Sequence, residues 1–441
     1  MRRIGISFLR IIDTAALEPP SSVESFQRQW SRRPGADQVR DEGSETLSGR
    51  ARMNDRRRDI DWLRVLAMLA VFVFHCTRFF DTEGWHLKNA EQSFVLFVLV
   101  RGLMWPWLME LFFLLSGVGA WYVLHTRSAG AFLVDRTKRL LVPLYTVGLL
   151  ALLPPQFYFE IASNRGYTGT FAETVARYFA AFDWPRLTLW PNTLVPVPFC
   201  GHLWFLQFLF LVSLATLPLL IFLKSPRGRR WIDRLARLFG RRGGAFAPAI
   251  PLAAALIVLR ALFPVGRGWA EFVWYAIYFV MGYMIPADER FTAAFKRHRW
   301  PALAVWLAGI FGGILTLVLL LGYDPMPGQE RFSLLFVFFQ VIWSLASVGS
   351  VVFILSLGAA YLDFGGRKLA HANEAVLPFY LFHQTIILVA GYFVIRWNIP
   401  VLPKFLVIVA LSFAAIMALY ELLVRPFNPV RFLFGMRPKR P

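Results

Sequence analysis

Apolar stretches of membrane-spanning length recur along most of the chain. The hydrocarbon core of a bilayer is about 30 Å thick, so a helix that crosses it needs about 20 predominantly apolar residues. The pattern predicts ten such helices, at residues 60–80, 104–124, 140–160, 202–223, 246–264, 269–286, 301–322, 334–360, 376–396 and 402–424. A shorter apolar stretch, 91–103, is interrupted by Arg101, and there we expect an interfacial helix or an extension of the second span. The expected fold class is all-α, a polytopic integral membrane bundle of about ten helices.

The two ends of the chain lack this pattern. Residues 1–55 are polar, rich in arginine and interrupted by prolines, which predicts a disordered basic tail. Residues 56–425 form the expected membrane domain, and residues 426–441 are expected to be a second, short basic tail. The compact run Met-Asn-Asp-Arg-Arg-Arg at Met53 is a candidate alternative translation start, a hypothesis that N-terminal sequencing tests.

Basic residues are concentrated between the apolar stretches. The formal net charge is +20, yet only 17% of the residues are charged, whereas soluble proteins carry about 25%. Lysine and arginine dominate four segments that a ten-helix bundle places on one side: 125–139, 224–245, 287–300 and 426–441. The positive-inside rule makes that side and both termini cytoplasmic, and the long loop 161–200 then faces outside. We therefore expect a multi-pass membrane protein, surrounded by lipid bilayer, with no nucleic-acid partner.

Several common kinds of site have no counterpart in the sequence. The two cysteines, Cys76 and Cys200, provide neither a disulfide framework nor the ligand spacing of a metal site. There is no P-loop and no Gly-x-Ser-x-Gly elbow, so we expect no metal and no bound cofactor. The chemistry must therefore lie within or beside the bilayer, where ionisable side chains are costly and usually functional.

The first predicted span carries Arg64 and His75. At about 100° per residue their spacing is close to three full turns, which places both on one helix face, about 16 Å apart along the axis. Such a pair can bind an anion at one end and act as a general base at the other. Alternatively, Arg64 extends to the lipid headgroups and His75 is a hydrogen-bonded histidine of the bundle interior.

The second span contains Glu110, an acid in an otherwise apolar run, followed by Ser116 and Gly117. A carboxylate at the depth of His75 can fix the tautomer of the imidazole and raise its basicity. We therefore expect Glu110 to assist His75 in catalysis; the alternatives are an ion pair with Arg101 or a polar cavity. Ser116 and Gly117 are expected mainly to allow close helix packing, with Ser116 as a candidate supporting residue.

A basic cluster follows the second span and contains Arg136, Lys138 and Arg139. Arg136 and Arg139 are three residues apart and therefore share one side of a helix. Guanidinium clusters suit phosphate or pyrophosphate groups, so we expect these three residues to bind a ligand that carries such groups. Ordinary positive-inside bias is the simpler explanation of the same residues.

Five further residues near the ends of spans are candidates for substrate binding or support: His202, Trp204, Tyr283, His383 and Glu421. We expect His383 and Glu421 to lie in the inner half of the membrane, close enough to pair. Polar contacts that hold helices together are the alternative for both.

The order and spacing of these motifs resemble the acyltransferase-3 family of membrane acyltransferases. The resemblance runs from about residue 57 to the C-terminus and rests on Arg64-x10-His75, Phe112-Phe113-x2-Ser116-Gly117, Arg136-x2-Arg139 with Pro143, and Gly282-Tyr283-Met-Ile-Pro286. Tyr283 stands where the family more often has phenylalanine. Within the family, the stretches 59–64, 202–206, 380–384 and 431–437 look like the osmoregulated periplasmic glucan succinyltransferase group.

This resemblance implies an enzyme that transfers an acyl group, of succinyl or acetyl type, from a cytoplasmic acyl-CoA to a carbohydrate hydroxyl. The acceptor would be a periplasmic or cell-envelope glycan. The resemblance further implies that His75 is the catalytic base and Arg64 its essential partner, and that Arg136 and Arg139 serve the donor. Direct attack on the thioester and a covalent acyl-enzyme intermediate are both open.

A proton-coupled transporter or flippase of a glycan or lipid-linked substrate is the alternative function, because intramembrane His, Glu and Arg also mark such carriers. Transporters usually show internal repeats and paired broken helices, and the two halves of this chain show no clear repeat. A structural or sensing scaffold leaves Arg64, His75 and the basic cluster without a role. The residues therefore favour the acyltransferase, whose oligomeric state the sequence does not reveal.

Overall fold

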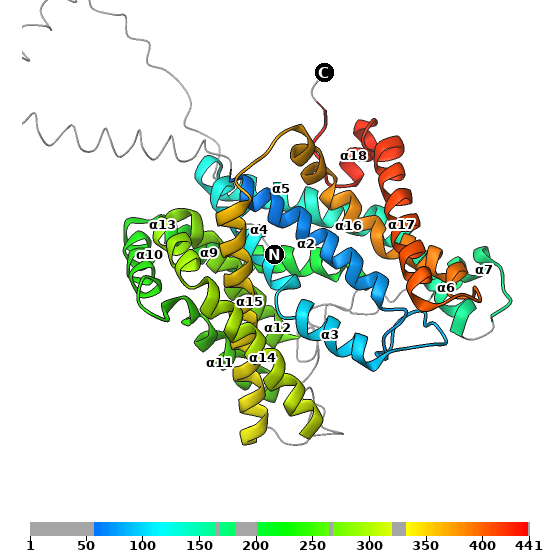
Figure 1. Ribbon diagram of the computed structural model, residues 1–441. Helices are drawn as coiled ribbons and strands as arrows, with labels where there is room; N and C mark the ends of the chain where they lie inside the picture. The colour runs from blue at the N-terminus through cyan, green and yellow to red at the C-terminus, as the bar shows by residue number, and fades with distance from the viewer. Residues whose placement is uncertain (1–56, 165–166, 181–200, 264–267, 320–331, 440–441) are drawn as a thin grey trace, which may run out of the picture. The chain divides into compact units, whose positions relative to one another are not determined.

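The described part of the chain is helical throughout (Figure 1). This computed structural model describes residues 57–164, 167–180, 201–263, 268–319 and 332–439. Within these residues no β-strand occurs, which confirms the all-α fold class. The basic tail expected at 1–55 lies outside them, as does Cys200, whereas Cys76 is a buried free thiol.

The crossing helices follow from the apolar pattern. Nine segments of the described chain are long and apolar enough to cross a membrane. Single helices form eight of them or most of their length: α2 (Arg58–Thr77), α4 (Leu108–Thr126), α9 (Trp204–Lys224), α11 (Ala249–Leu262), α12 (Trp269–Met284), α15 (Leu334–Tyr361), α16 (Arg367–Val394) and α17 (Val401–Leu419). The span predicted at 301–322 coincides with α14 (Arg299–Leu319) as far as the description extends. The chain is therefore a polytopic membrane helix bundle.

Two crossing helices begin earlier than their apolar residues indicate. The third span starts at Ala129 instead of residue 140, and α16 starts at Arg367 instead of residue 376. Polar residues extend both helices beyond their apolar stretches, so hydropathy alone underestimates their length. The third span is built from α5 (Ala129–Arg136), the π-helical segments η1 (Thr137–Leu141) and η2 (Leu144–Leu152), and α6 (Leu153–Asn164).

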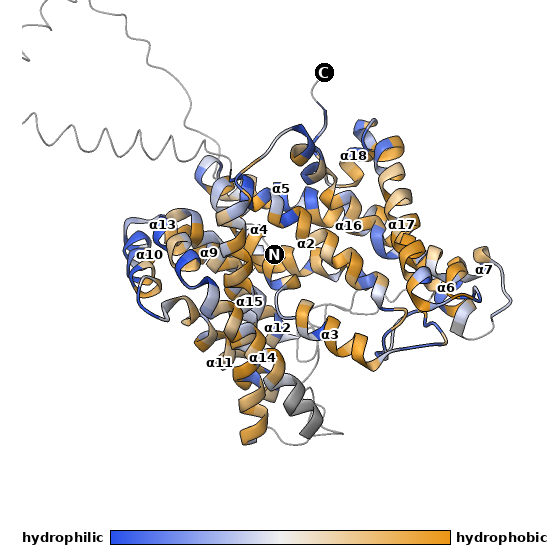
Figure 2. Ribbon diagram, viewed as in Figure 1, coloured by the Kyte–Doolittle hydropathy of each residue, from blue (hydrophilic) through white to orange (hydrophobic). Residues whose placement is uncertain are grey.

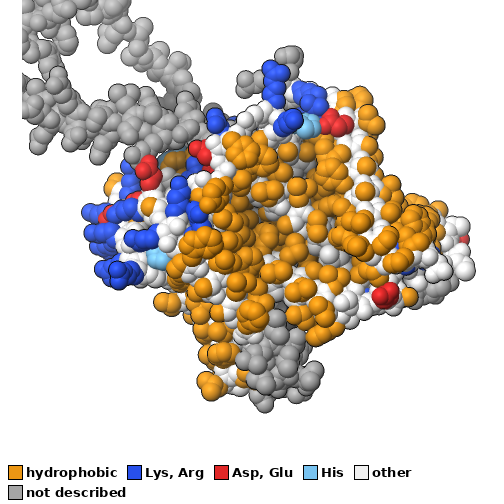
Figure 3. Space-filling view, viewed as in Figure 1, with side chains coloured by type: hydrophobic (Ala, Val, Ile, Leu, Met, Phe, Trp, Pro, Cys, Tyr) orange, Lys and Arg blue, Asp and Glu red, His pale blue; other side chains and the backbone are white. Residues whose placement is uncertain are grey.

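Shorter helices lie between the crossing helices: α3 (Phe94–Met104), α7 (Phe171–Ala180), α10 (Pro226–Phe239), α13 (Glu289–Arg297) and α18 (Asn428–Leu433). Orange, hydrophobic ribbon dominates the crossing helices in Figure 2, whereas α10 is largely blue. Figure 3 shows Lys and Arg side chains gathered over α10 and α13 and near the C-terminus, beside a broad hydrophobic face. This division into an apolar flank and basic ends is typical of a membrane protein.

The backbones of helices α4 and α12 come into close contact where the two helices cross. A Cβ atom on Gly117 would lie 1.9 Å from the carbonyl oxygen of Phe279, and one on Gly282 would lie 1.9 Å from that of Leu114. Only glycine allows such an approach, as in other small-residue crossings of membrane helices. The expected packing role is therefore confirmed for Gly117.

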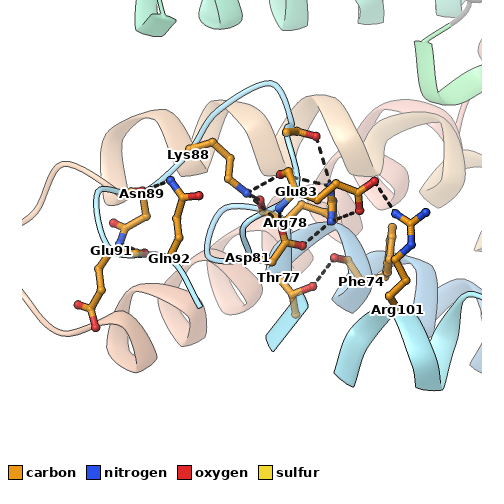
Figure 4. Close-up of polar contacts among 11 residues, drawn as sticks. Phe74, Thr77, Arg78, Asp81, Glu83, Lys88, Asn89, Glu91, Gln92 and Arg101 are labelled. Atoms are coloured by element: carbon orange, nitrogen blue, oxygen red, sulfur yellow. Dashed lines mark hydrogen bonds and ion pairs between the residues drawn. The ribbon is translucent and has the colours of Figure 1, made fainter. Parts of the chain in front are cut away.

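The segment between α2 and α3 is held by charged side chains (Figure 4). Arg78 pairs with Asp81 and lies 3.0 Å from Glu83. Lys88 lies 2.9 Å from Asp81, and Arg101 on α3 lies 2.5 Å from Glu83. Burial lowers the pKa of Lys88, while its hydrogen bond with Asp81 acts in the opposite direction. The network fixes this segment beside the end of α2.

The C-terminal residues pack against the bundle. Arg431 in α18 is 4% exposed, and its guanidinium lies 2.6 Å from Glu374 of α16. Gly435 has a φ of 68° and approaches Arg139 so closely that a Cβ atom would lie 2.6 Å from the carbonyl oxygen of that residue. The segment from residue 426, predicted as a separate tail, therefore contacts the bundle through Arg431 and Gly435.

Candidate active site

A cavity of about 460 Å³ lies near the start of α2. Five arginines line it, and we call it the arginine cavity: Arg64, Arg136, Arg139, Arg431 and Arg437. Two acidic residues, Asp135 and Glu374, also belong to its lining. The excess of guanidinium groups suits a ligand that carries several phosphate oxygens.

Carboxylate and amide groups orient several of these arginines. Arg64 donates from Nη1 to Oδ1 of Asp61 at 3.2 Å and to Oδ1 of Asn373 at 3.1 Å. The guanidinium of Arg139 lies 3.2 Å from Asp135, one turn earlier in the same span. A guanidinium is planar with its N–H donors in a fixed arrangement, so these contacts fix the direction of each group.

Arg136 is held differently, by a backbone group. Its Nη2 donates to the carbonyl oxygen of Ser116 at 3.1 Å, and its guanidinium lies 5.0 Å from the ring centre of Phe132. No acidic side chain of the described residues lies within 4.0 Å of it. Lys138 is exposed and does not line the cavity, so only Arg136 and Arg139 of the three predicted donor residues reach it.

Four of the seven histidines of the chain meet near the other end of α2: His75, His86, His202 and His383. We call this group the histidine cluster. The ring centres of His75 and His383 are 4.9 Å apart, and those of His202 and His383 are 5.1 Å apart. The ring centre of Trp85 is 6.2 Å from that of His75 and 5.5 Å from that of His86, so Trp85 contacts both histidines. In the residues described, no group of His, Cys, Asp or Glu has a geometry that could hold a metal ion.

Amide side chains surround the histidine cluster. Gln156 Nε2 lies 3.3 Å from His202 Nδ1, and its Oε1 accepts from Gln384 at 3.4 Å. Gln384 Nε2 also lies 2.9 Å from His86 Nε2, and His86 Nδ1 bonds Glu160. The ring of His86 therefore has the arrangement of an imidazole oriented by a carboxylate.

One neighbouring helix, α16, contacts both Arg64 and His75. Asn373 of α16 bonds Arg64, and His383 of the same helix faces the ring of His75. Arg64 and His75 both contact this one helix, as expected for residues that share a face of α2. The arginine cavity and the histidine cluster therefore lie near opposite ends of α2, and α16 contributes residues to both.

The predicted pair of His383 and Glu421 does not form. Glu421 lies 2.6 Å from His371 and 2.7 Å from Arg425. Because α16 begins at Arg367, His383 lies about 24 Å along the helix from its start, at the level of His75. The apolar pattern omits the polar first turns of α16 and therefore places His383 too near the inner end of its helix.

Glu110 does not contact His75 either. Its Oε1 accepts from Nε1 of Trp274 on α12 at 3.0 Å, and its Oε2 has no hydrogen-bond partner among the described residues. Arg101, the alternative partner, pairs with Glu83. Neither predicted partner is correct, because the side chain of Glu110 points from α4 toward α12.

Trp204 and Tyr283 lie outside both groups. The ring centre of Trp204 is 5.3 Å from that of Phe208 and 5.8 Å from that of Tyr275. Tyr283 is buried beside the α4–α12 crossing, with its ring centre 6.3 Å from that of His125. Of the five further candidates, the structure thus brings only His202 and His383 to His75.

Sequence reasoning missed several residues of these two groups. Asn373 lies in the polar first turns of α16, and Arg437 lies in the segment taken as a tail. His86 and Gln384 form a contact across 298 positions of the sequence, which no local pattern reveals. The stretch 431–437, which supported the family resemblance, was the available signal for the arginines of the C-terminus.

A membrane helix bundle with an arginine cavity at one end of α2 and a histidine cluster at the other suits a transferase that holds an anionic group apart from the reacting groups. The chain belongs to the acyltransferase-3 family of membrane acyltransferases: the family's acyltransferase domain matches residues 57–421. Its curated relatives include glucans biosynthesis protein C of Salmonella gallinarum, 23% identical over 395 residues, and that of Escherichia coli, 23% identical over 392 residues. The alignments cover 86% of this chain and 94% of each relative. No solved structure matches the chain.

Proposed function

We propose that this acyltransferase moves an acyl group, of succinyl or acetyl type, from acyl-CoA to a hydroxyl group of a periplasmic or cell-envelope glucan. The name of the curated relatives, which refers to glucans biosynthesis, supports this acceptor class. The basic residues over α10, α13 and the C-terminus support a bacterial inner-membrane location with the arginine cavity on the cytoplasmic side.

The arginine cavity supports acyl-CoA as the donor. Its volume of about 460 Å³ lies in the range of small-molecule sites, roughly 300–1,000 Å³. Coenzyme A carries phosphate groups at one end and the thioester at the other end of a flexible arm. Phosphates bound by Arg136 and Arg139 near the start of α2 would let that arm extend along α2 toward His75.

The hydrogen bonding of His75 suits a general base. Its Nδ1 lies 2.9 Å from the carbonyl oxygen of Val71; a carbonyl only accepts, so Nδ1 carries the hydrogen and Nε2 presents a lone pair. Nε2 takes the proton of the acceptor hydroxyl while the hydroxyl oxygen attacks the thioester carbonyl carbon. The C–S bond then breaks, and His75 returns the proton to the thiolate, giving the ester and free CoA. General-base catalysis of this kind contributes roughly 10²–10⁴-fold in rate.

The observation that carries the proposal is the shared face of α2, on which α16 meets both Arg64 and His75. A donor with charged and reactive ends fits this separation of about 16 Å. Arg64 lies at the charged end, and we assign it to donor binding.

The direct test uses the purified full-length protein in lipid nanodiscs with succinyl-CoA or acetyl-CoA and a gluco-oligosaccharide. Mass spectrometry should detect the acylated sugar with one of these donors. An acyl-pantetheine donor, which lacks the nucleotide phosphates, should react with a KM raised by roughly tenfold or more, because it cannot use the guanidinium groups. A transporter would yield no acylated sugar with either CoA donor, and that result would refute the proposal. In cells, the corresponding ester should disappear from envelope glycans when the gene is deleted.

A further inference from the structure

His383 presents a buried hydrogen-bond acceptor that no described residue satisfies. The side chain is 0% exposed, and its Nε2 has no hydrogen-bond partner among the described residues. A buried polar atom without a partner loses its bond to water and gains nothing in return, so its position needs an explanation, such as a ligand that binds there. The ring of His383 faces His75 at 4.9 Å.

The state of this nitrogen follows from the other side of the ring. Nδ1 of His383 lies 2.5 Å from the carbonyl oxygen of Tyr380. A carbonyl cannot donate, so Nδ1 holds the hydrogen and Nε2 of the neutral imidazole presents a lone pair. His75 is oriented by the same type of bond, to Val71. Two neighbouring imidazoles thus both present Nε2 as an acceptor.

In His202, another member of the histidine cluster, both ring nitrogens have hydrogen-bond partners. Its Nε2 donates to the carbonyl oxygen of Leu381 at 3.3 Å, and its Nδ1 lies 3.3 Å from the amide nitrogen of Gln156. Both nitrogens of His202 therefore have partners within the protein. The unmet acceptor of His383 is a property of that position and does not extend to the whole cluster.

We infer that His383 binds the acceptor: its Nε2 accepts a hydrogen bond from the hydroxyl adjacent to the one that His75 deprotonates. Neighbouring hydroxyls of a sugar ring would supply one donor to each of these two nitrogens, whose rings are 4.9 Å apart. Trp85, half-buried and 6.2 Å from His75, adds an aromatic surface beside them. The inference rests on the proposed function and adds that the enzyme selects a carbohydrate hydroxyl that has a hydroxyl neighbour.

The test compares wild type and His383→Phe, as full-length proteins in nanodiscs, on methyl glucoside and its singly deoxygenated analogues. NMR of the product first assigns the esterified position, which identifies the analogue that lacks the neighbouring hydroxyl. Wild type should lose roughly tenfold or more in kcat/KM on that analogue. His383→Phe should show a similar loss on methyl glucoside and no further loss on the analogue, because both changes remove the same bond.

Three controls separate this role from a structural one. The KM for acyl-CoA should stay unchanged in His383→Phe, because the arginine cavity is intact. His383→Asn, whose amide oxygen can accept, should recover part of the loss. His125→Phe removes a histidine with the same type of Nδ1 bond, 2.8 Å from the Trp121 carbonyl, outside the cluster, and should behave like wild type.

If His383→Phe loses further kcat/KM on the deoxygenated analogue, so that the two losses multiply, the inference is wrong. Equal activity of wild type on that analogue and on methyl glucoside would overturn it as well, and this measurement stands even when the variant does not fold. Absence of transfer by wild type to any sugar would instead count against the proposed function.

Discussion

The two ends of α2 are built from different kinds of interaction. In the arginine cavity, guanidinium groups are aimed by carboxylates, by the amide of Asn373 and by the backbone of Ser116. In the histidine cluster, imidazole rings are oriented by backbone carbonyls and glutamine amides and, at His86, by the carboxylate of Glu160. The arginine cavity therefore carries an excess of positive charge, whereas the histidine cluster offers oriented imidazole lone pairs.

This difference indicates a division of labour along one helix pair. Charges at a cavity bind a polyanionic ligand equally in the ground state and the transition state, so their loss should raise KM. A lone pair that takes a proton acts mainly in the transition state, so its loss should lower kcat. The comparison therefore makes opposite kinetic predictions for the two ends.

The largest effect is expected at the histidine end. His75→Ala should lower kcat by roughly 10²–10⁴-fold, because the lone pair that receives the hydroxyl proton is gone. The KM for acyl-CoA should stay within about twofold, since the arginine cavity is intact. Steady-state kinetics in nanodiscs at matched protein concentration measures both constants.

His125→Ala is the matched control for this prediction. His125 shares with His75 an Nδ1 bond to a carbonyl four residues earlier in its own helix, but it lies outside the histidine cluster. It should keep normal kcat. Near-normal acyl transfer by His75→Ala would show that His75 is not the general base. The histidine cluster would then not be the reactive end of α2.

A smaller effect, on stability, is expected where α4 crosses α12. Gly117→Ala would place Cβ 1.9 Å from the carbonyl oxygen of Phe279, and we expect a loss of about 1–3 kcal/mol from the overpacking. The displaced helix would also move the Ser116 carbonyl away from Arg136, so the donor end should suffer more than the histidine end. Thermal unfolding in detergent, followed by size-exclusion chromatography, measures the loss.

Gly119→Ala serves as the stability control two residues further along α4. Apart from its chain neighbours and the backbone of its own helix, no atom lies within 4 Å of its added Cβ, so the substitution should keep or raise the unfolding temperature. Equal unfolding temperatures for the two variants would mean that the close crossing at Gly117 does not contribute to stability.

Local spacing made part of this site predictable. The apolar pattern located the crossing helices, and the helical repeat placed Arg64 and His75 on one face, because both depend only on residues close in sequence. The same reasoning put Arg136 and Arg139 on one side, and both line the cavity.

Contacts between distant helices were beyond such patterns. The meeting of His75 with His202 and His383 depends on how three segments pack, and no spacing encodes it. The same limit explains why Glu110 was assigned to His75 although it bonds Trp274. An acid in an apolar helix shows that a polar partner is needed, but not which neighbouring helix supplies it.

The smallest effect, and the sharpest test of the charged end, comes from Arg136 and Lys138. Arg136→Gln should raise the KM for acyl-CoA by roughly tenfold, because a charge-assisted bond to a phosphate is lost, while kcat changes little. The same variant should leave the KM for acyl-pantetheine unchanged, since that donor lacks the nucleotide phosphates. Lys138→Gln removes an equal charge two residues away, from an exposed side chain that does not line the cavity, and should alter neither constant. Equal KM shifts for the two variants would mean that general positive charge at this membrane face, and not the cavity, attracts the donor.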